Sequence, residues 1–239
     1  MLKIERPGTG DNTRSIGPFS PSDPKRQAGG FFLSIGRNKK SVTIDLKHPR
    51  GIELARELVK KSDVVVENFR PGVMDRLGLG YSEQSRVNPR IVYTSVSGFG
   101  QTGPYKDRPS FDLIAQAMGG VMAMTGPKDG PPCKVGPGIG DLWAASLAAY
   151  ATMVAVVSAM KTGRGQHVEC AMYDSMLYMI ERAIMMYSMA GIVSRPVGNA
   201  HPLYAPYDCF ETKDGKHVVL AGHWDNQWRN LCRAMSRED

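Results

Sequence analysis

A single carboxylate, Asp174, stands near the start of an apolar segment that follows the glycine-flanked turn at residues 163–165. From Ala171 to Tyr187 the apolar positions recur near helical spacing, which predicts a helix with Asp174 in its first turn. Unpaired backbone N–H groups and the helix dipole stabilise a negative charge at that position. Taken alone, these residues favour a helix-start aspartate, a common role for acidic residues in first helical turns.

Basic residues gather in the first half of the chain, which carries the net charge of +7. Residues 1–110 hold 19 Lys and Arg against 11 Asp and Glu, a balance of +8, and the remainder holds 11 against 12. A basic half indicates an anionic partner. Because aromatic residues are not interleaved with these scattered charges, we expect a phosphorylated small molecule as partner and no nucleic acid.

The segments that must position these groups alternate between strands and helices over residues 1–110. Runs rich in β-branched residues predict strands, and amphipathic runs between them predict helices. This order predicts an α/β fold with a Rossmann-like, doubly wound parallel sheet. Ligands bind beyond the carboxyl ends of strands in such sheets, here near Lys47, Asn68 and Ser97. The predicted strands are 2–5, 41–46, 63–68 and 90–97, and the predicted helices are 48–61 and 73–77.

Helical patterns dominate after residue 110, and a further change of character follows Arg195. The long helices are predicted at 111–124, 140–160 and 171–189, followed by a hairpin of 207–212 with 217–221 and a helix over 224–235. We therefore predict a large α/β domain with long helices over residues 1–195 and the start of a smaller α+β domain over residues 196–239.

Composition limits the class of protein. Hydrophobic residues make up 42% and charged residues 22% of the chain, as in soluble globular proteins. The uncharged stretch Leu142–Met160 is rich in alanine, so we expect a buried helix and no membrane span. Four well-separated cysteines and the absence of a secretory leader indicate a reducing, cytoplasmic location. The five histidines show no ligand spacing, so we predict no metal site.

Five motifs in order along the chain point to a known family. They are Lys3–Gly8, Arg37–Ser41, Val66–Gly72, Ser97–Tyr105 and Thr162–Val168. Together they resemble the class III CoA-transferases, a family that includes formyl-CoA transferase, carnitine CoA-transferase and the related α-methylacyl-CoA racemases. The resemblance covers essentially the whole chain. It implies coenzyme A or acyl-CoA as substrate, and it makes the large predicted domain the CoA-binding one.

The resemblance gives Asp174 a second interpretation. In the transferases, the aspartate at this motif position attacks the acyl-CoA thioester and forms an acyl–aspartyl anhydride. CoA then becomes bonded to the aspartyl carbonyl, and an incoming carboxylic acid receives the CoA from it. The resemblance thus implies a CoA-transferase with Asp174 as its nucleophile. It also matches Asp112 to an acidic residue near the transferase active site, with helix capping as the alternative role of Asp112.

Seven residues match positions that contact CoA in the family. Two lie at its adenine and phosphate end, two line the pantetheine path, and three arginines supply cations that suit phosphates. Each has a structural alternative, such as a solvated surface charge for the cations and a core position for the phenylalanine. In that order the seven are Ile44 and Lys47, Asn68 and Phe69, and Arg6, Arg76 and Arg108.

A racemase is one alternative within the family. The racemases move a proton at the α-carbon with a His/Asp pair about thirty residues apart. This chain places Phe111 where they have histidine, although Asp141 follows 30 residues later. Because phenylalanine cannot transfer a proton, the sequence disfavours a racemase.

The other alternative is a catalytically incomplete homologue that binds CoA weakly or not at all. Relatives extend further at both ends, and those pieces complete the CoA site and the small domain. Family members form interlocked dimers, in which each ring-shaped chain threads the other. The resemblance therefore implies acyl-CoA, a carboxylic acid and a second copy of this chain as partners.

Overall fold

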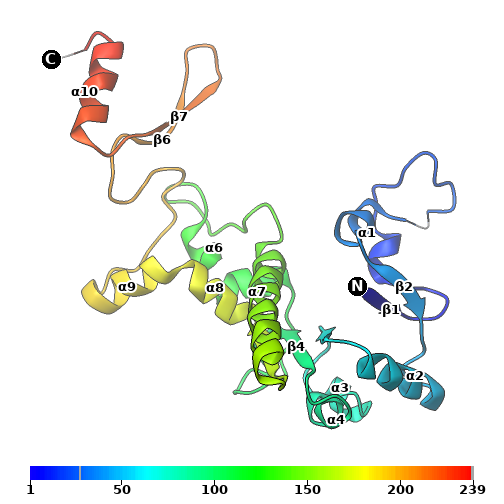
Figure 1. Cartoon of the computed structure of the whole chain (residues 1–239). Helices are drawn as coiled ribbons and strands as arrows, with labels where there is room; N and C mark the ends of the chain where they lie inside the picture. The colour runs from blue at the N-terminus through cyan, green and yellow to red at the C-terminus, as the bar shows by residue number, and fades with distance from the viewer. Residues whose placement is uncertain (27, 238–239) are drawn as a thin grey trace. The chain divides into compact units, whose positions relative to one another are not determined.

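Short segments of four to six residues, several of them rich in valine, form the strands of the computed structural model, which describes residues 1–26 and 28–237 (Figure 1). β1 pairs with β2 and β3 pairs with β4, both in parallel, while β5 joins the second sheet beside β4. The predicted α/β class is confirmed, and its strands lie in separate small sheets. The strands are β1 (Leu2–Glu5), β2 (Lys40–Thr43), β3 (Val64–Glu67), β4 (Val92–Ser97), β5 (His167–Ala171), β6 (Tyr207–Glu211) and β7 (His217–Ala221).

Two predictions about the strands need correction. β2 ends at Thr43 instead of residue 46, because the Asp45 side chain accepts the backbone N–H of Lys47 and turns the chain toward the next helix. A continuous valine run such as 64–66 is typical of a parallel strand covered on both faces, but β3 is open on one face, since Val66 is 61% exposed on a strand at the edge of its sheet. β5 has no counterpart among the predicted strands.

The helices fill the intervals between the strands along the chain. The predicted helices at residues 48–61, 73–77, 140–160 and 224–235 are confirmed with small shifts at their ends. The helices are α1 (Gly30–Ile35), α2 (Pro49–Lys60), α3 (Val73–Arg76), α4 (Tyr81–Val87), α5 (Asp112–Met118), α6 (Val121–Met124), α7 (Ile139–Thr162), α8 (Met172–Met179), α9 (Glu181–Ala190) and α10 (Asp225–Ala234), with a 3-10 turn at Asn12–Ser15.

Two of the predicted long helices are each broken into a pair. The segment 111–124 divides into α5 and α6 at Gly120, whose φ of 83° lies in the left-handed region that glycine adopts easily. The segment 171–189 divides into α8 and α9 at Ile180, whose φ of −106° and ψ of 26° leave the helical range. The break at Ile180 therefore separates the helix that carries Asp174 from the helix that follows it.

The described residues form two compact units. Unit 1 comprises Met1–Val96 with Ala148–Glu169, and unit 2 comprises Ser97–Leu147 with Cys170–Asp239. The division at residue 195 that the sequence indicates stays a prediction, and residues 238–239 of that small domain lie outside the described residues.

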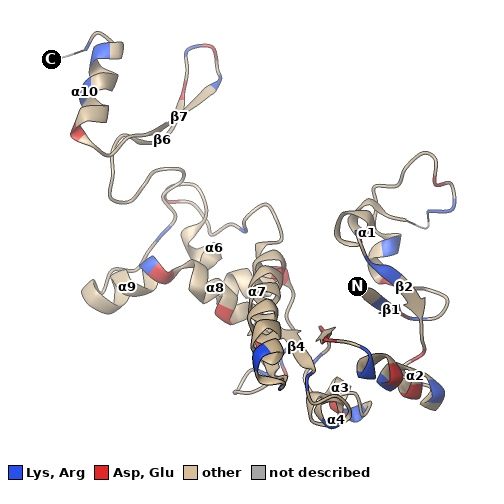
Figure 2. Cartoon of the chain, in the orientation of Figure 1, with Lys and Arg blue, Asp and Glu red and all other residues tan. Residues whose placement is uncertain are grey.

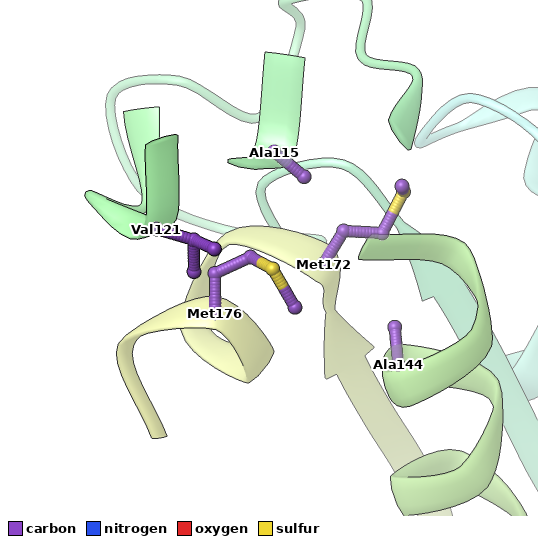
Figure 3. Packing of buried hydrophobic residues seen from close by; sticks show 5 residues of the cluster. All are labelled: Ala115, Val121, Ala144, Met172 and Met176. Atoms are coloured by element: carbon purple, nitrogen blue, oxygen red, sulfur yellow. The ribbon is translucent and has the colours of Figure 1, made fainter. Parts of the chain in front are cut away.

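Each unit has its own buried cluster. In unit 1, Val92 of β4 packs against Ala155 and Ala159 of α7, and Thr94 and Thr152 share a buried hydrogen bond of 2.7 Å. In unit 2, the end of α5 packs closely against α8. Gly119, which follows α5, leaves no room for a side chain, since an added Cβ would lie 2.3 Å from the Cβ of Met176 on α8. Figure 3 shows the unit 2 cluster, which consists of Ala115, Val121, Ala144, Met172 and Met176.

α7 exposes an apolar face, which corrects the expectation of a buried helix. Tyr150 and Met160 are each 72% exposed, and Figure 2 shows α7 uncharged along most of its length. Among the described helices it is the one long and apolar enough to cross a membrane, with a mean hydropathy of 1.7, and 28% of that window is buried. Since core helices of soluble proteins share these properties, the absence of a membrane span stays a prediction. Its buried positions are small: Gly140, Ala144, Ala148, Thr152, Ala155 and Ala159.

Glycine is needed at both Gly163 and Gly165, in the turn after α7, but for different structural reasons. Gly163 ends the helix with a φ of 74°, and its N–H donates to the carbonyl of Ala159. Gly165 passes so close to the start of β4 that a Cβ there would lie 1.9 Å from the carbonyl oxygen of Ile91. This close passage brings the chain into β5 and, through β5, to the start of α8.

Candidate functional site

Asp174 lies in the first turn of α8, immediately after β5, as the sequence predicts. The helix begins here because Ala171 and Met172 anchor its first turn in the core at 6% exposure each. Asp174 itself is exposed, and no hydrogen bond or ion pair among the described residues engages its carboxylate. The carboxylate is therefore free to react and lies where unpaired backbone N–H groups favour negative charge.

Aromatic side chains lie beside the start of α8 within unit 2. The N–H of Tyr173 donates to the carbonyl of Gly98 at 3.0 Å, which ties the start of α8 to the loop after β4. Phe99 lies 6.0 Å from Tyr173 and 5.8 Å from Tyr105, measured between ring centroids. The Arg108 guanidinium lies over the Tyr105 ring at 4.1 Å. These contacts connect the predicted cation Arg108 with the helix that carries Asp174.

Asp112 has both carboxylate oxygens occupied. One accepts the backbone N–H of Gly140 at 2.7 Å, in the first turn of α7, and the other accepts Nε2 of Gln116 at 2.8 Å. Gln116 is fully buried, and its own oxygen accepts the N–H of Val135. The pKa of nearby Asp141 is raised, because burial removes solvent from its carboxyl group and because Asp112 carries a negative charge. These contacts support the helix-capping role for Asp112, and its catalytic role stays a prediction.

A cavity of about 450 Å³ opens in unit 1 beside the end of β1. Its lining carries three arginines against one glutamate, together with hydroxyl groups, so it favours an anion. Glu5 neutralises Arg14 through two hydrogen bonds of 2.7 and 2.8 Å. Arg6 and Arg26 form no ion pair among the described residues, which leaves their charges available. The lining consists of Glu5, Arg6, Gly8, Thr9, Gly10, Arg14, Ser15, Arg26, Ser41 and Thr43.

The Glu5–Arg14 pair predicts how this part of unit 1 responds to acid. Hydrogen bonds from Arg14 lower the pKa of Glu5 from 4.5 to about 2. A lowered pKa contributes stability that is complete above the unfolded-state value and is lost as the pH falls through the folded-state value. We therefore expect hydrogen-exchange protection of the β1 and β2 amides to fall between pH 4.5 and about 2.

The Glu5→Gln variant is the control for this pH dependence. Because it removes the titrating carboxyl group, its protection factors should be lower at neutral pH and should fall less in acid. Equal pH dependence in the variant and the parent chain would contradict the assignment to Glu5.

The other residues predicted to contact CoA lie at the ends of elements. Ile44 is buried just after β2 and donates its N–H to the carbonyl of Glu5, beside the cavity. Asn68 donates its side-chain amide to the carbonyl of Val96 at 2.7 Å, so it joins the carboxyl ends of β3 and β4. Phe69 is 45% exposed, which excludes a core position for it. The remaining cations, Lys47 in the turn before α2 and Arg76 in α3, are exposed.

Sequence reasoning missed three features of these surroundings. Arg14 and Arg26 line the cavity, and their signal is an arginine-bearing, glycine-rich segment after a strand end. Gln116 supports Asp112 at an i, i+4 spacing on α5, a pattern visible in the sequence. Arg182 and His201 lie together although 19 residues apart, and no spacing indicates this. Within residues 1–26 and 28–237, no group of three metal-ligating side chains is present.

Comparisons with known proteins fit these features. The family model for CoA-transferase family III matches residues 1–239. The chain is 47% identical over 243 residues to succinyl-CoA:mesaconate CoA-transferase of Haloarcula hispanica, a match that covers 100% of this chain and 61% of the relative. It is 40% identical over 232 residues to acetyl-CoA:oxalate CoA-transferase of Acetobacter aceti, covering 97% of this chain and 58% of the relative.

A solved structure agrees with these relatives. A CAIB/BAIF family protein from Brucella suis superposes with a TM-score of 0.87 at 35% identity, covering 99% of this chain and 62% of that chain. The chain thus spans about three fifths of the length of the proteins it matches. The match extends from the first strand to the last helix of the described structure. The chain belongs to CoA-transferase family III.

Proposed function

We propose that this chain carries the nucleophile and part of the CoA site of an acyl-CoA:carboxylate CoA-transferase. The observation that carries the proposal is the exposed Asp174 carboxylate, which has no side-chain partner among the described residues and lies at the start of α8. The named activities of the relatives support the reaction class, since each transfers CoA between carboxylic acids. A racemase is disfavoured, because Phe111, before α5, stands where the racemases have histidine and cannot transfer a proton.

The first half of the reaction forms and exchanges covalent bonds on Asp174. A carboxylate oxygen attacks the thioester carbonyl carbon, the C–S bond breaks, and CoA leaves as a thiolate, which gives an acyl–aspartyl anhydride. The thiolate then attacks the aspartyl carbonyl carbon. The anhydride C–O bond breaks, the donor acid leaves as its carboxylate, and an aspartyl–CoA thioester remains.

The second half runs these steps in reverse with a new acid. The carboxylate of the acceptor attacks the aspartyl–CoA carbonyl and releases the CoA thiolate, which gives a second anhydride. The thiolate attacks the acyl carbonyl of this anhydride, and Asp174 leaves as a free carboxylate. No proton is gained or lost overall, so the site needs a nucleophile and held substrates but no dedicated general base.

The CoA molecule would bind with its charged end at the cavity of unit 1. Arg6 and Arg26 supply charge for phosphate groups, and the Thr43 hydroxyl lies beside them in the lining. Asn68 and Phe69 would contact the pantetheine arm, as the family resemblance implies.

Arg6→Gln tests the assignment of the cavity. We expect it to weaken CoA binding about tenfold, because it removes a phosphate-binding cation that has no carboxylate partner. Isothermal titration with CoA measures the dissociation constant. The matched control is Arg86→Gln, which removes an exposed arginine of α4 outside the cavity lining. Equal affinities of the two variants would contradict the assignment.

The relatives indicate the class of acid that exchanges CoA. Succinate, mesaconate and oxalate, which appear in their names, are dicarboxylic acids, while the acetyl-CoA named for the Acetobacter aceti relative carries a monocarboxylic acid. A third relative, succinyl-CoA:glutarate CoA-transferase of Homo sapiens, is 37% identical over 237 residues, covering 98% of this chain and 52% of the relative. We propose a dicarboxylic acid as substrate of the protein that contains this chain.

We also propose a homodimer, interlocked as the family resemblance implies, in the cytoplasm. The apolar face of α7 supports a protein partner, because large side chains such as Tyr150 and Met160 are exposed on it. The four free cysteines, Cys133, Cys170, Cys209 and Cys232, are in keeping with a reducing compartment.

Intact-protein mass spectrometry tests the proposed function. The chain is mixed with succinyl-CoA and its mass is followed over time, with and without hydroxylamine. We expect a mass increase of a succinyl or CoA group that hydroxylamine removes, because anhydrides and thioesters react with this nucleophile. The absence of any adduct would favour the incomplete homologue over the transferase.

A further inference from the structure

Tyr178 lies on the same exposed face of α8 as Asp174, one helical turn further along the chain. Residues four apart on an α-helix are neighbours, with about 5 to 6 Å between their Cβ atoms. Tyr178 is 65% exposed, and its hydroxyl has no hydrogen-bond partner among the described residues. An O–H donor that a substrate can reach therefore stands beside the proposed nucleophile.

Trp143 of α7 holds the Tyr178 ring in one place. The two rings stack with 6.2 Å between their centroids and an interplanar angle of 21°. Trp143 is itself fixed, because it packs against the buried unit 2 cluster that includes Met172 and Met176. Its Nε1 is buried without an acceptor among the described residues, so the indole contributes here through its face. Both stacked residues belong to unit 2.

The contact with Trp143 also determines the direction in which the Tyr178 side chain extends. Sγ of Cys170 donates to the carbonyl of Ala144 at 3.3 Å, so this turn of α7 lies beside the chain that enters α8. Figure 3 shows Ala144 close to Met172, in the first turn of α8. To stack on Trp143, the Tyr178 ring leans back toward the beginning of α8, which is also the direction that helical side chains prefer. The proposed nucleophile stands in that first turn.

The proposed reaction needs a hydrogen-bond donor at this place. When the Asp174 carboxylate attacks the thioester, the electron pair of the carbonyl bond moves onto the carbonyl oxygen, which becomes negative. Asp174 cannot stabilise this oxyanion, because it is an anion until it has reacted. A donor that meets the oxyanion lowers the barrier, since this charge is present in the transition state and absent from the bound substrate.

A neutral phenol suits this role better than a cation. A guanidinium beside Asp174 would form a charge-assisted pair with its carboxylate and stabilise it before the reaction. The Tyr178 O–H forms no hydrogen bond with Asp174 in the structure. The carboxylate therefore keeps its electron pairs for the attack on the thioester.

We propose that Tyr178 is a catalytic residue that donates its O–H to the oxyanion formed when Asp174 attacks the thioester, and that Trp143 positions it. The inference rests on the proposed function, which supplies the nucleophile and the thioester. The acyl carbon bonds to Asp174, its oxygen accepts the hydrogen bond, and the proton stays on Tyr178. The electron pair then returns to the carbonyl, the C–S bond breaks, and CoA leaves as a thiolate.

Tyr178→Phe tests the proposal, because it removes the hydroxyl and keeps the ring that stacks on Trp143. The chain is mixed with succinyl-CoA at a series of concentrations, quenched, and weighed intact, which gives the rate of adduct formation. We expect the maximal rate to fall about ten- to a hundredfold, somewhat less than for an oxyanion donor in an enclosed site. The succinyl-CoA concentration at half the maximal rate should stay unchanged, because the donor acts in the transition state alone.

Tyr187→Phe is the matched control. Tyr187 lies on α9 of the same unit, is 64% exposed and has no side-chain hydrogen bond among the described residues. It should keep the rate of the parent chain. An equal loss in both variants, or an unchanged maximal rate in Tyr178→Phe, would overturn the proposal. So would a higher half-saturating concentration at an unchanged maximal rate, because Tyr178 would then bind the substrate before the reaction.

A double-mutant cycle tests the positioning role of Trp143. Trp143→Leu removes the stacking face and should lower the maximal rate severalfold, while Trp143→Phe keeps an aromatic face and should recover most of it. In a chain that already carries Tyr178→Phe, Trp143→Leu should cost no further rate, because no hydroxyl is left to position. An equal loss in both backgrounds would contradict the positioning role. Circular dichroism of each variant separates a lost contact from a lost fold.

The parent chain separates this proposal from the proposed function. If succinyl-CoA leaves no adduct on the parent chain, the nucleophile assignment fails and the oxyanion donor fails with it. If the adduct forms on the parent chain and forms at the same rate on Tyr178→Phe, the donor assignment fails alone.

Discussion

Asp174→Asn should abolish the covalent adduct that succinyl-CoA leaves on this chain and lower CoA transfer at least about a thousandfold. The amide keeps the size of the side chain but lacks the negative oxygen that attacks the thioester. Because Asp174 is exposed and has no side-chain partner among the described residues, the substitution should cost less than about 1 kcal/mol, the helix-dipole stabilisation of its charge. Intact mass and the rate of succinyl transfer from succinyl-CoA measure the two effects.

Asp225→Asn is the matched control for this prediction. Asp225 is also an exposed aspartate in the first turn of a helix, α10 of the same unit. It should keep the adduct and the transfer rate of the parent chain. An adduct of unchanged yield in Asp174→Asn would exclude Asp174 as the nucleophile and return it to the helix-start role.

Gly165→Ala should destabilise the chain by about 3 to 5 kcal/mol, because the new methyl group overlaps fixed backbone. An added Cβ would lie 1.9 Å from the carbonyl oxygen of Ile91 and 2.5 Å from its carbonyl carbon. Ile91 is fully buried, and the Gly165 N–H donates to the carbonyl of Pro89 at 2.9 Å, so neither segment moves away easily. Urea unfolding followed by circular dichroism gives the free energy.

Gly163→Ala is the comparison within the same turn. Its φ of 74° strains any other residue, but no atom lies within 4 Å of the added Cβ. The expected cost is about 1 to 2 kcal/mol, which is the penalty of the left-handed conformation alone. Equal losses in the two variants would show that backbone conformation, and not the close passage at Ile91, makes Gly165 necessary.

The sequence predicts those parts of the fold that depend on neighbours along the chain. The hairpin of β6 and β7 follows from alternation around a glycine turn, and α2 follows from its apolar stripe and the proline that begins it. The positions of breaks were not predictable in this way. Ile180 is an apolar residue in an apolar run, and it leaves the helical range where it packs against the core of unit 2. Tertiary packing decides such a break.

The candidate site divides in the same manner. Asp174 was predictable because its helix start and its motif are both local. The charges around it were not, because their partners come from other elements: Glu5 meets Arg14 across a loop, and Arg182 meets His201 across a whole helix. Periodicity carries no information about such pairs.

The one-residue break at Ile180 has a consequence for how relatives of this chain diverge. The proposed nucleophile Asp174 lies on α8, and α9 begins only after Ile180, so the residues that follow the break belong to a separate helix. Substitutions on α9 can then accumulate while Asp174 keeps its place on α8. We therefore expect substitutions on α9 to be tolerated more readily than substitutions on α8, which would displace Asp174.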